Sequence, residues 1–273
     1  MFWPSVRRHK HGVQDGAKTQ LTDEQWDRIK DLFPWEPPTR YGGRPRKHPR
    51  GCLEGIMWVL RSGARWKDLP NTFPSFSTCW RRFRDWTESG IFKVAWSRLL
   101  QELDDLGEMN WEEAMADGTF SPAKKGAPEV GKTKRGKGTK IMLLIDGEGL
   151  PLGVDTESAN AAEVNLIERL LDRRTMQRPP ARLIYDKAGD SDPLRERLAA
   201  RGIDLISPHR RNRKRRPTQD GRKLRRYRRR YKVERTIAWL QSFRRLVTRY
   251  EYHAHLFKGF VQLACLFTIL QRF

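Results

Sequence analysis

The spacing of apolar residues changes near residue 111, and this change limits the folds that the chain can adopt. Before that point, apolar residues recur every three or four positions, which is the pattern of amphipathic helices. After it, short apolar runs at 140–145 and 150–154 flank the turn sequence Asp-Gly-Glu-Gly, and later runs alternate with helical stretches. Strands in hairpin order that then alternate with helices predict a mixed α/β sheet. The sequence therefore predicts an all-helical part followed by an α/β part.

The helical part is expected to contain four helices. The first begins at Thr22 or Asp23, either of which can act as N-cap, and prolines after Phe33 end it. The other three are expected at about 52–62, 77–88 and 91–106. In the third of the four helices, Phe76, Trp80 and Phe83 are expected to face inward. The fourth carries the apolar residues Val94, Leu99, Leu103 and Leu106. A turn between two short helices favours a helix-turn-helix whose third helix reads DNA, although a plain helical bundle fits the same pattern.

The α/β part is expected to continue after its hairpin with alternating helices and strands. The expected elements are a helix at 161–171, a strand at 182–185, a helix at 193–201, a strand at 203–206, a long helix at 231–250 and a buried helix at 256–270. Lys258 and Gln262 interrupt the last of these, which falls short of the roughly 18 uninterrupted apolar residues of a membrane span. No membrane partner is therefore expected.

The charge balance indicates a polyanionic partner. The chain has 55 Lys and Arg against 33 Asp and Glu, a formal net charge of +22. Nucleic acid is the usual partner of so basic a protein, with ribosome-associated proteins and anionic-membrane binders as alternatives. Fourteen of the cations lie in the segment 209–232, where Asp220 is the single acid. We expect this segment to bind DNA, the alternative being a solvated loop that becomes ordered only on DNA.

Two further groups of basic residues are candidate DNA contacts. The loop Gly-Gly-Arg-Pro-Arg-Lys-His at 42–48 is compact and rich in donors, which suits phosphates or a narrow groove, although a solvated linker has the same composition. The expected third helix carries arginines on its outer side. The candidates from these two segments are Arg44, Arg46, Lys47, Arg81, Arg82 and Arg84.

The cysteines and the N-terminus bear on the compartment. Cys52, Cys79 and Cys265 are scattered and lack CxxC spacing, which argues against a disulfide framework and against a cysteine-ligated zinc site. We expect each to be a small buried hydrophobe, as in a reducing cytoplasm. The first apolar residues give way at once to a basic stretch, so no signal peptide is expected.

Three carboxylates stand where surface acids rarely do. Asp117 is expected at the end of the first strand of the α/β part, and Asp186 follows the buried strand at 182–185. Glu234 lies near the start of a long helix, between Arg230 and Arg235. Such acids can hold two Mg²⁺ ions, because Mg²⁺ is a hard cation that takes oxygen ligands. Two metal ions held side by side support phosphodiester cleavage. Each acid also has a purely structural interpretation. Asp117 can be a turn residue, Asp186 can cap the following helix, and Glu234 can form an ion pair at the surface.

The same residues resemble a known family. Three segments, Ala-Asp-Gly-Thr at 116–119, Tyr-Asp-Lys-Ala at 185–188 and Val-Glu-Arg-Thr-Ile-Ala-Trp-Leu at 233–240, resemble the acid motifs of DDE transposases of bacterial insertion sequences. Within these the chain looks closest to the insertion-sequence-five group of the insertion-sequence-four/five superfamily. The N-terminal half, with Arg-Ser-Gly-Ala-Arg-Trp-Lys-Asp-Leu-Pro at 61–70, is similar to the helical DNA-binding domain of such enzymes. The resemblance covers roughly residues 20–270.

The resemblance implies a fold, a reaction and a set of ligands. It implies a ribonuclease-H-like catalytic domain preceded by a small all-α domain, with Asp117, Asp186 and Glu234 as metal ligands for two Mg²⁺, for which Mn²⁺ can substitute. It implies strand cleavage by water and strand transfer by a DNA 3′-hydroxyl at terminal inverted repeats. The implied partners are double-stranded DNA and a second copy of the chain in a paired-end complex, without a small-molecule substrate. The implied location is the cytoplasm of a bacterium, at the nucleoid.

The wider class also carries a Tyr-x2-Arg-x3-Glu-x6-Lys signature. Tyr227, Arg230 and Glu234 fit it, whereas its last position is Gln241. That departure puts a phosphate contact at this position in doubt, and Arg244 or Arg245 can supply the missing charge. Lys137 and Lys140, in the motif Lys-Gly-Thr-Lys, complete the DNA contacts that we expect.

The expected organisation is a tail at 1–20, a DNA-binding domain at 21–107 and a catalytic domain at 108–273, with the basic segment 209–232 as an insertion in it. The leading alternative is a catalytically decayed or domesticated transposase that only binds DNA. An RNA-associated protein leaves the three acids unexplained, and the motifs disfavour another ribonuclease-H-like nuclease, such as a junction resolvase.

Overall fold

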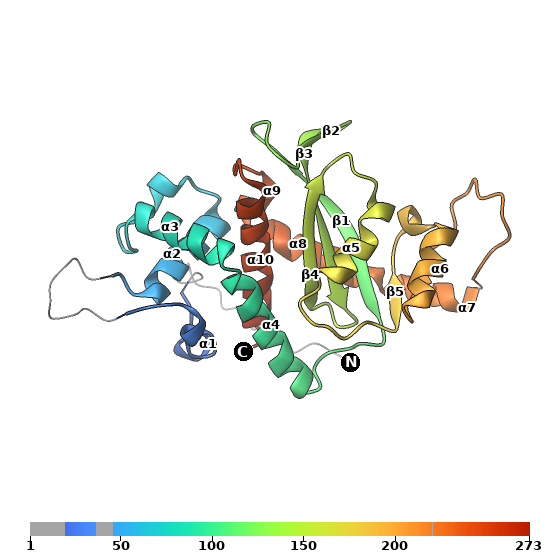
Figure 1. The fold of residues 1–273 in the computed structure, drawn as a ribbon, viewed down its shortest axis with the longest axis horizontal. Coiled ribbons are helices and arrows are strands. Elements are labelled where there is room, and N and C mark those ends of the chain that lie inside the picture. The colour runs from blue at the N-terminus through green and yellow to red at the C-terminus, as the bar shows by residue number, and fades with distance from the viewer. Residues whose placement is uncertain (1–19, 37–45, 220) are drawn as a thin grey trace, which may run out of the picture.

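The computed structural model describes residues 20–36, 46–219 and 221–273. The predicted tail at 1–20, apart from Gln20, and the candidate DNA contact Arg44 lie outside these residues. Figure 1 shows the helices α1–α4 on one side of the molecule, the sheet on the other, and α10 between them.

The N-terminal part is helical, as predicted. Its elements are α1 (Asp23–Asp27), a 3-10 turn (Lys30–Leu32), α2 (Pro49–Ser62), a second 3-10 turn (Trp66–Asp68), α3 (Phe76–Glu88) and α4 (Ile91–Asp105). Thr22 is the N-cap of α1, and it forms a capping box with Gln25 because each side chain accepts the backbone N–H of the other residue. Trp26, Ile29 and Phe33 are buried, as the pattern predicted.

The predicted inner face of α3 was partly wrong, and α4 buries only some of its apolar residues. In α3 the buried side chains are Cys79, Phe83 and Trp86, whereas Phe76 is 43% and Trp80 is 37% exposed. α3 therefore turns a neighbouring stripe of residues inward. In α4, Val94 and Leu106 are exposed, and the buried stripe includes Phe92, Trp96, Leu99 and Leu103. The apolar residues of both helices offered two stripes, and packing against the rest of the fold selected one of them.

The predicted mixed sheet is confirmed. Its strands are β1 (Ala114–Pro122), β2 (Gly131–Thr133), β3 (Gly136–Asp146), β4 (Pro151–Ser158), β5 (Arg182–Ile184) and β6 (Asp204–Ile206). Their order is β2-β3-β1-β5-β6, and β4 pairs with β3. β1, β3 and β4 are antiparallel, whereas β5 is parallel to β1 and to β6. This architecture, together with the helical N-terminal part, is the fold class that the sequence predicted.

The turn between β3 and β4 forms as its sequence predicts. Asp146 accepts hydrogen bonds from the backbone N–H groups of Asn110, Glu148 and Leu150, at 2.9, 3.0 and 2.7 Å. Gly149 has a φ of 96°, which an L side chain rarely adopts. The turn is thus held by a carboxylate at its first residue and released from steric strain by a glycine at its last.

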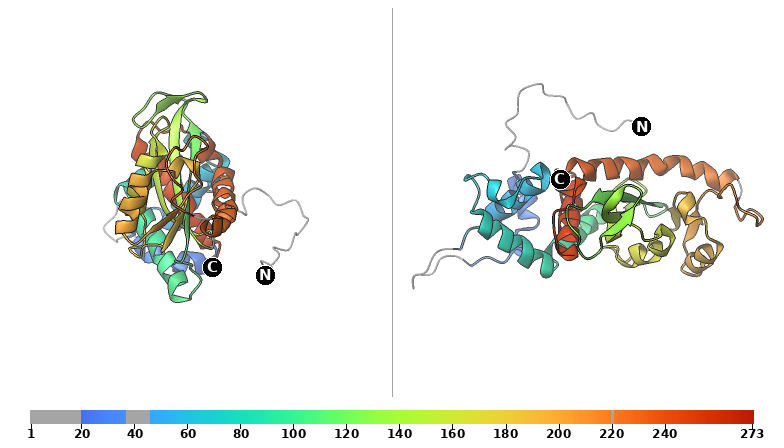
Figure 2. Two further views of the ribbon diagram at one scale, coloured as in Figure 1. Left: turned by 90° about the vertical axis from the view of Figure 1, so that its right-hand side faces the viewer. Right: turned by 90° about the horizontal axis from the view of Figure 1, so that it is seen from above.

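Helices cover both faces of the sheet. The helices and 3-10 turns (η) after β4 are η3 (Glu163–Asn165), α5 (Ile167–Asp172), η4 (Lys187–Gly189), α6 (Asp192–Ala200), α7 (Gly221–Leu224), η5 (Arg225–Arg230), α8 (Tyr231–Ser242), α9 (Arg244–Val247) and α10 (Ala254–Leu270). Figure 2 shows α8 along one face of the sheet and α5 and α6 on the opposite side. η5 leads directly into α8, so the basic segment is joined to a helix that packs on β1 and β3.

Two predicted helices are shorter than expected. The stretch at 161–171 divides into η3 and α5, and the stretch at 231–250 breaks at Phe243, whose backbone is extended. Phe243 is buried, and its ring lies 5.9 Å from the guanidinium of Arg61 and 6.4 Å from the ring of Phe267. Burial of this ring against α10 and α2 accounts for the break.

α10 joins the helical part to the sheet. It contacts α3, α4, α8 and β4, and most of its side chains are buried. Lys258 of α10 reaches the fully buried Asp155 of β4, with Nζ 2.9 Å from Oδ1. Cys52, Cys79 and Cys265 are free and buried, as predicted. Over the part of the chain that the structure describes, α10 included, no helix has the length and apolar character that crossing a membrane requires.

Candidate active site

Asp117 and Asp186 lie at the same level of two adjacent strands. The parallel pairing of β1 with β5 ends at Met115 and Ile184, and the two acids follow two residues later on each chain segment. The prediction that Asp117 ends its strand was wrong, because β1 continues to Pro122 in antiparallel pairing with β3. The pairing between β1 and β5 nevertheless stops just before the two acids, so both carboxylates lie where β1 no longer has β5 as its parallel neighbour.

Glu234 meets this pair through an arginine. Glu234 lies in the first turn of α8, and its side chain is 57% exposed. The guanidinium of Arg230 forms an ion pair with Glu234 and a second one with Asp117, where Nη2 lies 2.6 Å from Oδ2. Burial lowers the pKa of Arg230, but the nearby charges of Asp117, Glu234 and Asp186 outweigh it and raise that pKa above its usual value. Arg230, which is half-buried, therefore bridges two of the predicted acids, Asp117 and Glu234, and the charge of Asp186 acts on it without a direct contact.

Asp117 remains in a strained electrostatic position despite this ion pair. Burial raises the pKa of Asp117 above its usual range, and the charges of Asp186 and Glu163 add to that effect. Arg230 and a hydrogen bond from the backbone N–H of Gly118, at 2.9 Å, act in the opposite direction. The net rise shows that burial of the Asp117 carboxyl outweighs the stabilisation that Arg230 and Gly118 give to its charge.

Asp186 also acts as a helix cap. Its Oδ1 accepts the backbone N–H of Ala188 at 2.8 Å, at the start of η4. Its backbone carbonyl accepts the hydroxyl of Ser207 at 2.6 Å. The capping interpretation of the sequence is therefore correct, and it is compatible with a role in the site because the cap fixes the carboxylate beside β1.

The structure adds an acid that sequence reasoning missed. Glu163, in η3, accepts the hydroxyl of Tyr185 at 2.8 Å and lies 3.2 Å from the Nζ of Lys140. Burial raises the pKa of Tyr185 above its usual range, and the charge of Glu163 and this hydrogen bond raise it further. Glu163 belongs to none of the acid motifs of the sequence, so only the tertiary contacts single it out.

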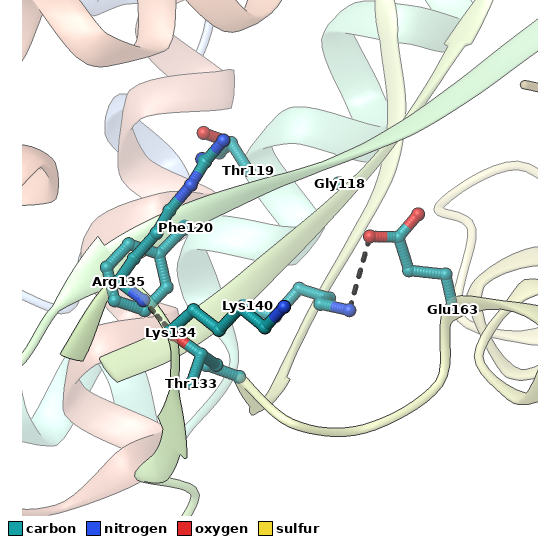
Figure 3. A pocket seen from close by; sticks show the side chains of 9 residues that line it. Gly118, Thr119, Phe120, Thr133, Lys134, Arg135, Lys140 and Glu163 are labelled. Carbon is teal, nitrogen blue, oxygen red and sulfur yellow. Dashed lines mark hydrogen bonds and ion pairs between the residues drawn. The ribbon is translucent and has the colours of Figure 1, made fainter. Parts of the chain in front are cut away.

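A pocket of about 360 Å³ opens beside Glu163. Its lining includes Phe120 and Thr133 and the cations Lys134, Arg135 and Lys140. Figure 3 shows Lys140 directed across the pocket toward Glu163, with Arg135 close to the ring of Phe120. The Nζ of Lys140 also donates to the carbonyl oxygen of Ala161 at 2.8 Å. An aromatic face among cations suits a nucleic acid strand that passes close to Asp117.

The predicted DNA contacts differ in their availability. Arg46, Lys47, Arg81, Lys137 and Arg244 are exposed, and Arg82, Arg84 and Tyr227 are half-buried. Gln241 donates to the hydroxyl of Thr119 at 2.8 Å. Arg245 is a correction, because it is buried and pairs with Glu251 at 2.7 Å. Its guanidinium is neutralised by Glu251 inside the protein, so Arg245 is no longer a candidate DNA contact.

Part of the basic segment 209–232 holds the segment to the protein. Arg226 and Arg229 form ion pairs with the buried Glu113, at the start of β1, and Arg229 lies 2.8 Å from it. Arg213 pairs with Asp190 and Asp192, at 3.3 and 2.8 Å. Other cations of the segment are exposed, and they are Arg211, Lys214, Arg216, Arg225 and Arg228. The predicted DNA-binding role therefore falls on this second set.

The donor chemistry of the site fits a divalent metal. Asp117, Asp186 and Glu234 offer the carboxylate oxygens that Mg²⁺ takes, and Arg230 already stands among them as a positive charge. In residues 20–36, 46–219 and 221–273, no three acidic, histidine or cysteine side chains are grouped closely enough to hold one ion together. In this arrangement Arg230 lies between Asp117 and Glu234 and pairs with both.

Comparisons with known proteins give the family context. Residues 113–269 match the family described as "Transposase DDE domain", and residues 21–96 match the one described as "Putative transposase of IS4/5 family". The chain is 35% identical over 153 residues to the "Putative transposase for insertion sequence element IS402" of Burkholderia cepacia, which covers 51% of this chain and 68% of that protein. It is also 35% identical over 121 residues to the "Insertion element IS402 uncharacterized 16.2 kDa protein" of the same species, which covers 43% of this chain and 82% of that protein.

A solved structure shares the fold. The chain resembles the piggyBac transposase of a cryo-EM synaptic complex with hairpin DNA, with a TM-score of 0.51 and 12% sequence identity. The similarity covers 94% of this chain and 74% of that one. At this level of identity the similarity concerns the fold alone.

Proposed function

We propose, from the premise that this chain belongs to the transposase DDE domain family, that it cleaves DNA at the ends of its insertion sequence and joins them to a target. The observation that carries the proposal is that Arg230 forms ion pairs with both Asp117 and Glu234, while the pairing of β1 with β5 places Asp186 beside Asp117. Acids that only contribute solubility would not be grouped around one half-buried guanidinium.

The reaction that we propose has two phosphoryl transfers. Water attacks the phosphorus at the element end, the bond from phosphorus to the 3′ oxygen breaks, and the strand leaves as a 3′-hydroxyl. That hydroxyl then attacks a phosphodiester of the target DNA and displaces another 3′ oxygen. Divalent cations, when bound, activate the attacking oxygen and stabilise the leaving one.

The residues of the chain have distinct roles in this proposal. Asp117, Asp186 and Glu234 hold the cations, Mg²⁺ or in its place Mn²⁺. The cap that Asp186 makes on η4 fixes its carboxylate on the sheet. Arg230 neutralises Asp117 and Glu234 in the free protein and is well placed to contact a DNA phosphate once it moves away from them. Gly118, directly after Asp117, leaves the strand without a side chain at that point.

We assign DNA recognition to the helical part. The proposed division is a DNA-binding domain at 21–107 and a catalytic domain at 108–273, with α3 as the recognition helix of a helix-turn-helix-like unit. Arg81 and Arg82, together with Arg46 and Lys47, supply phosphate contacts. Lys137, Arg244 and the exposed arginines of the segment 209–232 extend these contacts along the catalytic domain. Two copies of the chain pair the two element ends, and the nucleoid remains the predicted location.

Wild-type protein is expected to nick a labelled duplex that carries the terminal inverted repeat of its own element in the presence of Mg²⁺ and not in the presence of EDTA. The metal is needed because carboxylates alone cannot stabilise the leaving oxygen. The products are resolved on a denaturing gel. Equal nicking with EDTA would contradict the proposal, and tight binding without nicking in Mg²⁺, with both ends supplied, would favour the decayed transposase.

Replacing Arg81 or Arg82 by alanine is expected to weaken binding to a fluorescent duplex and to reduce its dependence on salt. Each phosphate contact that is lost lowers the slope of log affinity against log salt by about 0.9. Fluorescence anisotropy across a salt series gives the slope. Arg197→Ala on α6 is the control, because Arg197 pairs with Glu168 away from α3. Equal slopes for Arg81→Ala, Arg82→Ala and Arg197→Ala would remove α3 from the DNA interface.

A further inference from the structure

Glu163 approaches the strand that carries Asp117 from the face opposite to Glu234. Successive side chains of a strand point to opposite faces, so Gly118 faces away from the side on which Arg230 meets Asp117. A Cβ atom added at Gly118 would lie 3.0 Å from Oε1 of Glu163. The absence of a side chain at Gly118 thus leaves room for the carboxylate of Glu163 one residue from Asp117.

Both oxygens of Glu163 are held. Its Oε2 accepts the hydroxyl of Tyr185 at 2.8 Å, and its Oε1 lies 3.2 Å from the Nζ of Lys140. Tyr185 is fully buried and directly precedes Asp186. Glu163 is therefore fixed between β1 and β5, the two strands that position Asp117 and Asp186. Its side chain is 22% exposed and lines the pocket beside Gly118.

The charges around this point are out of balance. Arg230 pairs with Asp117 and Glu234, and Lys140 pairs with Glu163. With Asp186, these ion pairs set two cations against four carboxylates. The contacts with Tyr185 and Lys140 hold Glu163 in this position even though the like charge of Asp117 repels it. An excess of negative charge is favourable where divalent cations bind.

We propose that Glu163 is a fourth carboxylate of the active site, which adds its negative charge to the binding of divalent cations at Asp117 and Asp186. This inference rests on the proposed function, because it concerns the same metal site. Tyr185 is a positioning residue in it, since it is buried and holds Glu163, and Lys140 holds Glu163 from the lining of the pocket. The affinity of the free protein for metal therefore depends on Glu163 as well as on the three acids of the motifs.

The test is a titration of the full-length protein with Mn²⁺ in the absence of DNA, followed by electron paramagnetic resonance of the free ion. Glu163→Gln is expected to weaken Mn²⁺ binding by about tenfold, at the lower end of the effect of losing a partner around a metal site. Asp186→Asn, which removes a ligand, is expected to weaken binding more. Glu168→Gln is the control, because Glu168 lies on α5 and pairs with Arg197. We expect its affinity to equal that of the wild type.

Each outcome distinguishes the two proposals. Wild-type affinity in Glu163→Gln with reduced affinity in Asp186→Asn would overturn the role of Glu163 and leave the proposed function intact. Wild-type affinity in both variants would overturn the metal site itself. Circular dichroism checks that the variants are folded. Should Glu163→Gln fail to fold, Glu163→Ala provides the test, since it removes the same negative charge without leaving an amide group beside Tyr185 and Lys140. Unchanged Mn²⁺ affinity in folded Glu163→Ala would then overturn the inference.

Discussion

Asparagine at position 117 or 186, or glutamine at position 234, is expected to abolish metal-dependent cleavage and leave DNA binding intact. Each change keeps the size of the side chain and removes the negative charge that holds a cation. We expect cleavage to fall by a factor of at least about 10³, which corresponds to about 4 kcal/mol of transition-state stabilisation. Binding is retained because the proposed DNA contacts of α3 lie on a different element from these acids.

The measurement pairs a single-turnover cleavage assay in Mg²⁺ with anisotropy on the same duplex. Asp204→Asn is the control for the aspartates. Asp204 begins the neighbouring strand β6, and it pairs with Lys223 at 2.9 Å. We expect this variant to cleave at the wild-type rate. A variant at position 117, 186 or 234 that cleaves as fast as the wild type shows that its residue is misassigned.

Replacing Asp155 by alanine is expected to destabilise the fold by about 2–3 kcal/mol. Removing one partner from a fully buried ion pair costs about 3–5 kcal/mol, and the cost is smaller here because water reaches the three cations that remain. Asp155 is fully buried in β4. It pairs with Arg173 and Arg169 at the end of the sheet that α5 covers, with Arg169 at 2.6 Å, and with Lys258 of α10 at 2.9 Å. Loss of the carboxylate leaves three cations facing one another where α5, β4 and α10 meet.

Urea unfolding at neutral pH measures this effect. Asp172→Ala is the matched control, since Asp172 also pairs with an arginine, Arg201, but its side chain is 61% exposed. Exposed ion pairs contribute about 0–1 kcal/mol, so this variant should unfold near the wild-type midpoint. Equal midpoints for Asp155→Ala and the wild type would show that the buried ion pairs do not stabilise the junction.

The contribution of Asp155 depends on pH. Burial raises the pKa of Asp155, but the hydrogen bond and charge of Lys258, with those of the arginines, outweigh it and hold the pKa below its usual value. A lowered pKa in the folded state means that the unfolded chain binds the proton more tightly. The stabilisation is therefore fully present above the unfolded pKa of about 3.9 and is lost as the pH falls through the folded value. The difference between wild type and Asp155→Ala should shrink only in strong acid.

The order of the elements and the three motif acids could be predicted because their signals are local. The capping box at Thr22, the turn at Asp146 and the apolar run of β3 each depend on residues within a few positions of one another. Asp117, Asp186 and Glu234 stand in short motifs that resemble those of a known family. These patterns can be recognised in the sequence without knowing which elements pack together.

Contacts between distant segments could not be predicted in this way. The inner stripe of α3, the break at Phe243 and the burial of Arg245 depend on the packing of α10 and its neighbours. The division of the arginines between protein and solvent depends on acids such as Glu113, more than a hundred positions before Arg226 in the chain. The periodicity and composition of the sequence give no information about which residues far apart in the chain form ion pairs.

The site shows the same division. Local patterns made the three acids candidates, and the resemblance of their motifs to those of a known family supplied the predicted role. Only the pairing of β1 with β5 brings Asp117 beside Asp186, and only the fold of the chain back across the sheet brings Glu163 to within hydrogen-bonding distance of Tyr185. A carboxylate without a motif acquires its neighbours from the register of the strands and the packing of η3, and those depend on contacts over the whole chain.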